Sequence, residues 1–154
     1  AGDGIGYMFP VPAIVDSKVI STVLKEDSQV QDVLNLAKEA QTTIFSIGAL
    51  SKQSILYEVG YLKDEDYHGL EEKGAVGDIA SRFFDINGKI ADENLDERVV
   101  GLDLGELKKK EWNIAVAVGN QKVDAIIGAL NGGFANVLYT DEKTARLLLE
   151  KVNR

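Results

Sequence analysis

The sequence predicts an α/β fold: a Rossmann-like, mostly parallel sheet with flanking helices and an antiparallel hairpin excursion. Three observations lead to this class. Residues 114–139 read as a strand, a helix and a second strand, which is the βαβ pattern of a parallel sheet. Residues 42–47 form a short β-branched and apolar run, typical of another buried strand. The pair Asn87-Gly88 is a strong signal for a hairpin turn and indicates the antiparallel excursion.

The first half of the chain alternates extended and helical patterns. Apolar residues recur at helical spacing in two stretches before the strand at 42–47. In order, we expect a short strand at 13–15, a helix capped by Asp16 or Ser17, a helix from Ser28, the strand at 42–47, an ambiguous segment at 54–61 and a short acidic helix at 64–70.

The second half carries the hairpin and the βαβ unit. The expected elements are a hairpin of 82–85 with 88–90, a strand at 98–103, a short helix at 104–110, the strand at 114–118, a helix at 123–130, the strand at 135–139 and a last helix capped by Asp141. No internal repeat or linker divides the chain, so we expect one domain over residues 1–154.

Composition narrows the possible functions. The chain has 154 residues, of which 45% are hydrophobic and 27% charged, which suits one globular domain with its own core. The absence of cysteine excludes disulfides and thiolate metal sites, and the single histidine, His68, excludes a multi-histidine metal site. A net charge of −8 disfavours nucleic-acid binding by this chain alone. No apolar run is long enough to cross a membrane, and we expect a cytoplasmic protein.

The turn after the strand at 114–118 is the main candidate ligand site. Ligands of open α/β sheets bind beyond the carboxyl ends of the strands, where the following helix presents free amides and the positive end of its dipole. Gly119 lets the backbone approach a ligand, Asn120 lies in the same turn, and Lys122 adds an ammonium group. We therefore expect this turn to bind an anion, most simply a phosphate. The alternative is an ordinary turn with a solvated lysine.

Two further stretches are candidates for the same site. Gly48 follows the strand at 42–47, and Gly77-Asp78 lies in a third glycine-marked stretch. The Asp78 carboxylate could accept hydrogen bonds from hydroxyls, although it could equally cap a helix or form an ion pair. Arg82 lies one helical turn from Asp78 if this segment is helical, and it either pairs with Asp78 or contacts the ligand.

Several blocks of sequence, in this order, carry a resemblance to a known family: FPVPAIVDS from Phe9, SIGAL from Ser46, GAVGDIASRFFD from Gly74, RVVGLDL from Arg98, AVGNQKVDAIIGAL from Ala117 and NVLYTDEKTARLLL from Asn136. With these blocks the chain resembles the effector-binding domain of bacterial transcription regulators of the SorC/deoxyribonucleoside-regulator type. The likeness covers nearly the whole chain.

The resemblance implies a fold related to ribose-5-phosphate isomerase and glucosamine-6-phosphate deaminase. It also implies a sensor without catalytic residues, cofactor or metal, which binds a phosphorylated sugar and forms dimers or tetramers. Operator DNA would be bound by a separate N-terminal helix-turn-helix domain that is absent from this chain. The family pattern assigns phosphate or sugar contact to Lys122, hydroxyl contact to Asp78, and the pocket lining to Gly48, Ala49 and Leu50.

The chain departs from the family pattern in two ways. Val118 stands where the family has a second glycine, which is expected to crowd the phosphate. A first βα unit, with a phosphate loop, is missing, so we expect a truncated domain with an incomplete pocket and a sheet with an exposed apolar edge and face. Two other functions stay open: a sugar-phosphate isomerase or deaminase with Asp78 as the base, and a scaffold for oligomerisation.

Overall fold

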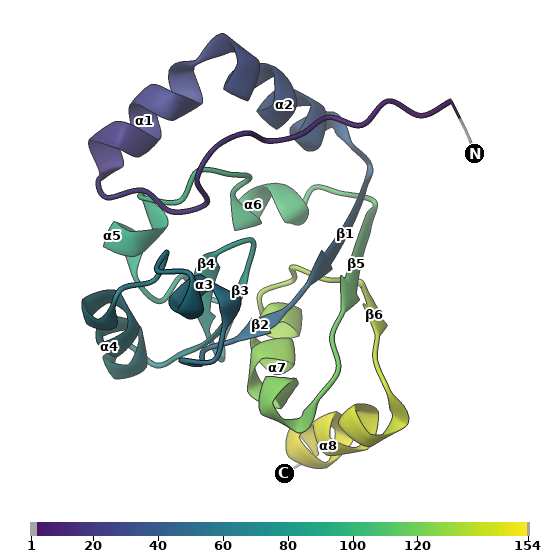
Figure 1. The fold of residues 1–154 in the computed structure, drawn as a ribbon. Coiled ribbons are helices and arrows are strands. Elements are labelled where there is room, and N and C mark those ends of the chain that lie inside the picture. Colours follow the sequence, from purple (N-terminus) through teal and green to yellow (C-terminus); the bar gives the residue numbers. More distant parts are fainter. Residues whose placement is uncertain (1–2, 154) are drawn as a thin grey trace.

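The computed structural model describes residues 3–153, which form two three-stranded sheets with helices around them (Figure 1). The strands are β1 (Thr42–Ser46), β2 (Gly48–Ala49), β3 (Ala75–Ile79), β4 (Arg82–Asp85), β5 (Trp112–Val116) and β6 (Val137–Tyr139). The helices are α1 (Lys18–Glu26), α2 (Ser28–Glu39), α3 (Ile55–Glu58), α4 (Asp64–Glu72), α5 (Glu93–Asp96), α6 (Leu104–Leu107), the 3₁₀ turn η1 (Asn120–Lys122), α7 (Val123–Asn131) and α8 (Glu142–Val152).

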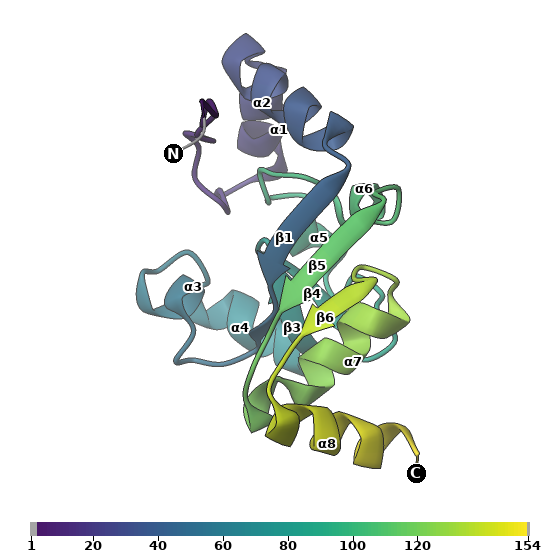
Figure 2. The same cartoon turned by 90° about the vertical axis from the view of Figure 1, so that its right-hand side faces the viewer.

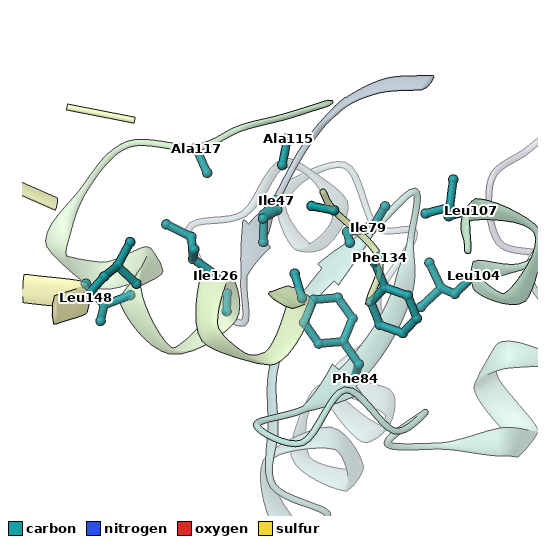
Figure 3. Packing of buried hydrophobic residues seen from close by; sticks show 14 residues of the cluster. Ile47, Ile79, Phe84, Leu104, Leu107, Ala115, Ala117, Ile126, Phe134 and Leu148 are labelled. Carbon is teal, nitrogen blue, oxygen red and sulfur yellow. The ribbon is translucent and has the colours of Figure 1, made fainter. Parts of the chain in front are cut away.

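The parallel sheet has the order β1-β5-β6, and α7 crosses over between β5 and β6 as the βαβ pattern predicts. One face of this sheet packs on α7. Ile47, Ala115 and Ala117 point from it toward Ile126, and the ring centroids of Phe84 and Phe134 lie 5.6 Å apart in the same core (Figure 3). The expected α/β class and the presence of strands near 42–47 and 114–118 are therefore confirmed, with bounds of Thr42–Ser46 and Trp112–Val116. The expected burial of these strands is wrong for one of their two faces, because alternate residues of both strands are exposed.

The opposite face of the parallel sheet lacks a covering layer among the described residues. In Figure 2 the strands β1, β5 and β6 lie in front, with α7 and the antiparallel sheet behind them. Ile44 is 69% exposed, Trp112 50%, Val116 46% and Tyr139 62%. We call these four residues, with the half-buried Ile114 and Val137 between them, the open face. It matches the apolar exposed face expected from the sequence.

The antiparallel excursion is a second sheet of order β2-β3-β4. The turn between β3 and β4 was not predicted from the sequence. Ile79 pairs with Arg82, so Ala80 and Ser81 alone form this turn. Their φ angles are positive, at 50° and 67°. This stretch is therefore a β-hairpin, and the helix that we considered around Asp78 is wrong. The hairpin predicted at Asn87-Gly88 is reduced to one isolated bridge, between Phe84 and Ile90, after a turn in which Gly88 has a φ of 75°.

The expected helix caps are present. The Ser17 side chain accepts from the Ile20 amide, and the Asp141 side chain accepts from the Thr144 amide at the start of α8. The side chain of Asp27 caps α2 by accepting from the amides of Gln29 and Val30, so that α2 begins directly after α1 ends. No helix among residues 3–153 combines the length and apolar character needed to span a bilayer.

The strand predicted at 98–103 is wrong. Only Val99 forms an isolated bridge, with Ile14, and the rest of the segment is a loop that leads into α6. The reason is tertiary, because the carbonyls of Gly101 and Leu102 accept hydrogen bonds from the Arg82 guanidinium instead of joining a ladder. Arg98 in turn donates to the Val15 carbonyl and to Asp66.

Candidate functional site

A hollow of about 500 Å³ lies at the carboxyl ends of β1 and β5. It is the position at which open α/β sheets bind ligands. Polar side chains and small residues dominate its lining, which consists of Ser46, Gly48, Ala49, Ser51, Gln53, Ser54, Ile55, Leu56, Asp78, Ala80, Ser81, Gln121 and Lys122. Two of these residues carry charge, Asp78 and Lys122, and we call the hollow the Asp78–Lys122 pocket.

Lys122 is positioned by the turn that joins β5 to α7. Gly119 has a φ of 124°, a conformation that side chains other than glycine rarely adopt, and its N–H donates to Thr144 Oγ1 at 3.0 Å. Thr144 is fully buried, and its own N–H donates to Asp141 Oδ1 at 2.7 Å. Helix α8 therefore holds the turn in place. Lys122 directly precedes α7, and its ammonium group gives the pocket a positive charge that favours an anion. The backbone amides at this junction are already paired within the turn, Lys122 N–H with the Gly119 carbonyl and Val123 N–H with the Asn120 carbonyl.

Asp78, on β3, also lines the pocket. One carboxylate oxygen accepts from the Ser81 amide at 3.1 Å, and no lysine or arginine among the described residues lies within ion-pair distance of it. A Cβ atom on Gly48 would overlap this carboxylate, so glycine at position 48 is what allows Asp78 to lie over β2. Burial raises the pKa of Asp78 above its usual range, against the opposing effects of the Ser81 amide and the Lys122 ammonium.

The backbone beside Asp78 is strained. Ala80 and Ser81 both occupy the left-handed region, which costs about 1–3 kcal/mol per residue that is not glycine, and both line the pocket. The strained turn brings the Ser81 amide to the Asp78 carboxylate and therefore fixes the direction of that side chain. Strain of this kind is concentrated at binding sites, where it holds a group in position before the ligand arrives.

Some of the residues predicted for the site line the pocket, and others do not. It brings together Lys122, Asp78, Gly48 and Ala49, whereas Leu50 packs against the core around Leu62 and Leu70. Gly119 supports the pocket from behind. Asn120 faces a separate hollow of about 770 Å³ between the start of α7 and α8. Val118, expected to crowd the phosphate, is 48% exposed and does not line the pocket.

Arg82 is not part of the pocket. Its side chain is 2% exposed and donates to the carbonyls of Leu102, Asp96 and Gly101. Its guanidinium nitrogens also lie 2.7 Å from an Asp96 carboxylate oxygen and 2.6 Å from one of Asp103. The predicted pairing with Asp78 is therefore wrong, because β4 directs Arg82 to the opposite side of the hairpin from the pocket.

The polar loop that lines one side of the pocket was not among the residues predicted for the site. Ser51, Gln53 and Ser54, between β2 and α3, supply hydroxyl and amide groups, and Gln121 adds an amide beside Lys122. The sequence did contain a signal for the loop, because a run of polar residues follows the expected strand-end loop at Gly48. No cluster of three or more His, Cys, Asp or Glu residues within 3–153 could hold a metal ion, and His68 is an exposed residue beside Glu71.

Replacing Asp78 with asparagine is expected to stabilise the ligand-free protein at neutral pH. Folding raises the pKa of Asp78, so the free energy of unfolding falls as pH rises from the usual value of 3.8 to the value in the folded state, and stays lower above it. Asparagine cannot ionise and still accepts from the Ser81 amide. We expect a gain of about 1 kcal/mol at pH 7, measured as a melting temperature a few degrees higher by differential scanning calorimetry.

The matched control is Asp32→Asn on the exposed surface of α2. It should change the free energy of unfolding by less than about 0.5 kcal/mol, and its melting temperature should follow the wild-type pH dependence. If the Asp78→Asn variant were less stable than the wild type at pH 7, an unidentified favourable contact of the ionised carboxylate would be needed, and the burial argument would be wrong.

Comparisons with known proteins agree with this geometry. Residues 3–150 match the family model described as "Putative sugar-binding domain". The chain is 37% identical over 140 residues to the deoxyribonucleoside regulator of Bacillus subtilis (strain 168), an alignment that covers 91% of this chain and 44% of that protein.

Two solved structures show the same fold. A DeoR family transcriptional regulator from Listeria monocytogenes has a TM-score of 0.87 at 33% identity, with coverage of 92% of this chain and 57% of that one. The full-length sorbitol operon regulator SorC from Klebsiella pneumoniae has a TM-score of 0.81 at 28% identity, with coverage of 90% and 45%. The chain thus spans about half the length of these proteins.

Proposed function

The chain belongs to the sugar-binding domain family of SorC/DeoR-type transcriptional regulators, and on this premise we propose that it senses a phosphorylated sugar. Binding of the sugar would modulate how a separate domain of the regulator binds operator DNA. This chain carries a net charge of −8, so the proposal assigns DNA contact to another domain. A bacterial regulator of this kind would act in the cytoplasm.

One observation carries the proposal: Lys122, from the turn before α7, and Asp78, from β3, line the same pocket. The Lys122 ammonium group suits a phosphate, which accepts hydrogen bonds at several oxygens. Asp78 offers acceptor capacity that the Ser81 amide does not exhaust, which suits neutral hydroxyl groups. A volume of about 500 Å³ accommodates a small sugar phosphate.

Sensing requires that the sugar bind one arrangement of the regulator more tightly than another. The pocket is bordered by segments from both sheets, namely the end of β1, the β3–β4 turn and η1. A ligand that joins Lys122 to Asp78 would therefore fix the two sheets relative to each other. We propose that this coupling transmits the binding event to the DNA-binding part.

The test is a calorimetric titration with a panel of phosphosugars and their unphosphorylated counterparts. We expect binding of a phosphorylated member only, and we expect Lys122→Ala to weaken it by about 10- to 100-fold, because a hydrogen bond to a charged group contributes about 1.5–3 kcal/mol. The control is Lys143→Ala, an exposed lysine of α8 that has no carboxylate partner among the described residues and should leave the affinity unchanged.

Two outcomes would contradict the proposal. Equal affinity of the wild type and the Lys122→Ala variant would exclude the phosphate role of Lys122, and no binding of any member would mean that this chain alone does not sense the sugar. The relatives are named as regulators. The enzyme alternative rests on Asp78 as a general base with a raised pKa. Turnover of a phosphosugar that Asp78→Asn abolishes would establish catalysis instead.

A further inference from the structure

A small polar hollow of about 290 Å³ lies between helices α1 and α2 and the loop that leads into α6 (Figure 1). The last turn of α1 contributes Lys25, and one face of α2 contributes Gln31, Asn35 and Lys38, which follow each other at helical spacing. Residues 101–103 also line it. We call it the Lys25–Lys38 hollow, and it shares no lining residue with the pocket described above.

The two lysines of this hollow have no carboxylate partner in the part of the chain that the structure describes. Neither Lys25 nor Lys38 forms an ion pair within residues 3–153. Asp103 lines the hollow with them, but its carboxylate lies 2.6 Å from the Arg82 guanidinium. The two ammonium groups are therefore available to an anion from solution.

Lys25 holds its charge in an unfavourable place. The residue is half-buried, and this burial lowers the pKa of its ammonium group. The nearby Arg82 guanidinium lowers the pKa further, whereas Asp103 and Asp96 raise it. An anion in the hollow would favour the charged form of Lys25 and would offset its repulsion from Arg82.

Lys38 is not needed to stabilise the end of its own helix. A lysine in the last turn ordinarily complements the negative end of the helix dipole. In α2 the buried Lys110 already does so, because its Nζ donates to the carbonyl of Ala37 at 2.6 Å and to that of Lys38. The pKa of Glu106 is lowered mainly by its hydrogen bond with Lys109, 2.6 Å away, and to a smaller extent by Lys38.

We propose that the Lys25–Lys38 hollow binds an oxyanion of the phosphate class, held by the two ammonium groups and by the side-chain amides of Gln31 and Asn35. Two ammonium groups match the charge of a phosphate dianion, and each amide can donate two hydrogen bonds to its oxygens. The site is independent of the proposed function, because none of its residues lines the Asp78–Lys122 pocket.

The size of the hollow limits what it can hold. Its volume of about 290 Å³ lies at the lower end of the range for small-molecule sites, about 300–1,000 Å³. It therefore suits inorganic phosphate, or the phosphate group of a monoester whose remainder extends into solvent. The site is partly exposed, so we expect a dissociation constant of about 1 mM at low salt, which rises as salt screens the charges.

The probe is inorganic phosphate, added to the ligand-free chain at about pH 7.5, where the dianion predominates. In two-dimensional NMR spectra at constant ionic strength, we expect the backbone amide signals of residues 31–38 and 101–103 to shift along one saturating curve. Methyl phosphate should bind equally well if the hollow accepts a phosphate monoester, and more weakly if it accepts free phosphate alone. Acetate, which carries one negative charge, should bind at least about tenfold more weakly than phosphate.

Lys25→Gln and Lys38→Gln each remove one charge from the hollow at a position that is half-buried or exposed, so both variants should fold. Each is expected to raise the dissociation constant for phosphate about 5- to 20-fold, because a charge-assisted hydrogen bond is lost. The matched control is Lys143→Gln, an exposed lysine of α8, which should leave the constant unchanged. Circular dichroism checks that all three variants fold.

Three results would overturn the proposal: no saturating shift of these amide signals up to about 50 mM phosphate, shifts of equal size with acetate, or an unchanged dissociation constant in both hollow variants. Shifts confined to residues 119–123 would place phosphate beside Lys122 and would also exclude the Lys25–Lys38 hollow. The phosphosugar titration is read from Lys122, so either proposal can fail without the other.

Discussion

Replacing Arg82 with leucine is expected to lower the free energy of unfolding by about 3–5 kcal/mol, because the change leaves buried polar groups without their partner. The guanidinium is 2% exposed and joins three backbone carbonyls and the carboxylates of Asp96 and Asp103. Those carbonyls hold the 101–103 loop against β4. For a chain of this size, the loss corresponds to a fall in melting temperature of more than about 6 °C, measured by calorimetry or urea unfolding.

Two companion variants separate the contributions of charge and geometry. Arg82→Lys keeps the charge but not the planar fork, so it should be intermediate in stability. Asp103→Asn alters a carboxylate that is 69% exposed, and its effect should stay below about 1 kcal/mol. A variant Arg82→Leu with wild-type stability but without phosphosugar binding would contradict this structural role. It would support the alternative prediction that Arg82 contacts the ligand.

Replacing Gly77 with valine is expected to cost about 3 kcal/mol or more and to abolish ligand binding, because there is no room for a side chain at this position. Gly77 lies on β3, where a Cβ atom would overlap the Gly48 carbonyl oxygen on one side and the Ala125 side chain on the other. The clash involves backbone and a buried helix, which cannot move aside as a flexible side chain would. It would push β2 and α7 away from β3 and separate Asp78 from Lys122.

Urea unfolding measures the loss of stability, and the same titration used for Lys122 measures the loss of binding. The matched control is Gly105→Ala in α6, where a Cβ atom would meet nothing within 4 Å. Alanine should stabilise this helical position by up to about 1 kcal/mol. An unchanged urea midpoint for Gly77→Val would contradict the close contact between β3 and α7.

The parts of the fold that the sequence predicted are those in which the deciding interactions are local. The βαβ unit from β5 to β6 follows from apolar periodicity within about ten residues, and the caps at Ser17 and Asp141 involve neighbours three residues away. Such patterns act over one or two turns of chain, so they can be detected without the partner that each face eventually contacts.

The predictions that were wrong concern segments whose conformation is decided by contacts distant in the sequence. Residues 98–103 have the composition of a strand, but the guanidinium of the buried Arg82 donates hydrogen bonds to the carbonyls of Gly101 and Leu102. Ala80 and Ser81 carry no turn signal, because the pairing of β3 with β4 imposes their positive φ angles against local preference. In both places a contact between segments outweighs the propensity of the residues themselves.

Sequence position alone predicted the two charged groups of the candidate site. Gly119 and Lys122 after one strand, and Gly48 and Asp78 near the others, were predicted from strand-end position and from family resemblance, and they surround one pocket or support it. The remaining features became visible in the folded chain: Arg82 is buried among carbonyls and carboxylates, Asn120 faces another hollow, residues 51–54 line the pocket, and one face of the parallel sheet is open. The physical reason is that charge pairing, exclusion of water and the covering of an apolar face depend on residues distant in the sequence, whereas the chemistry of a strand-end turn is encoded within it.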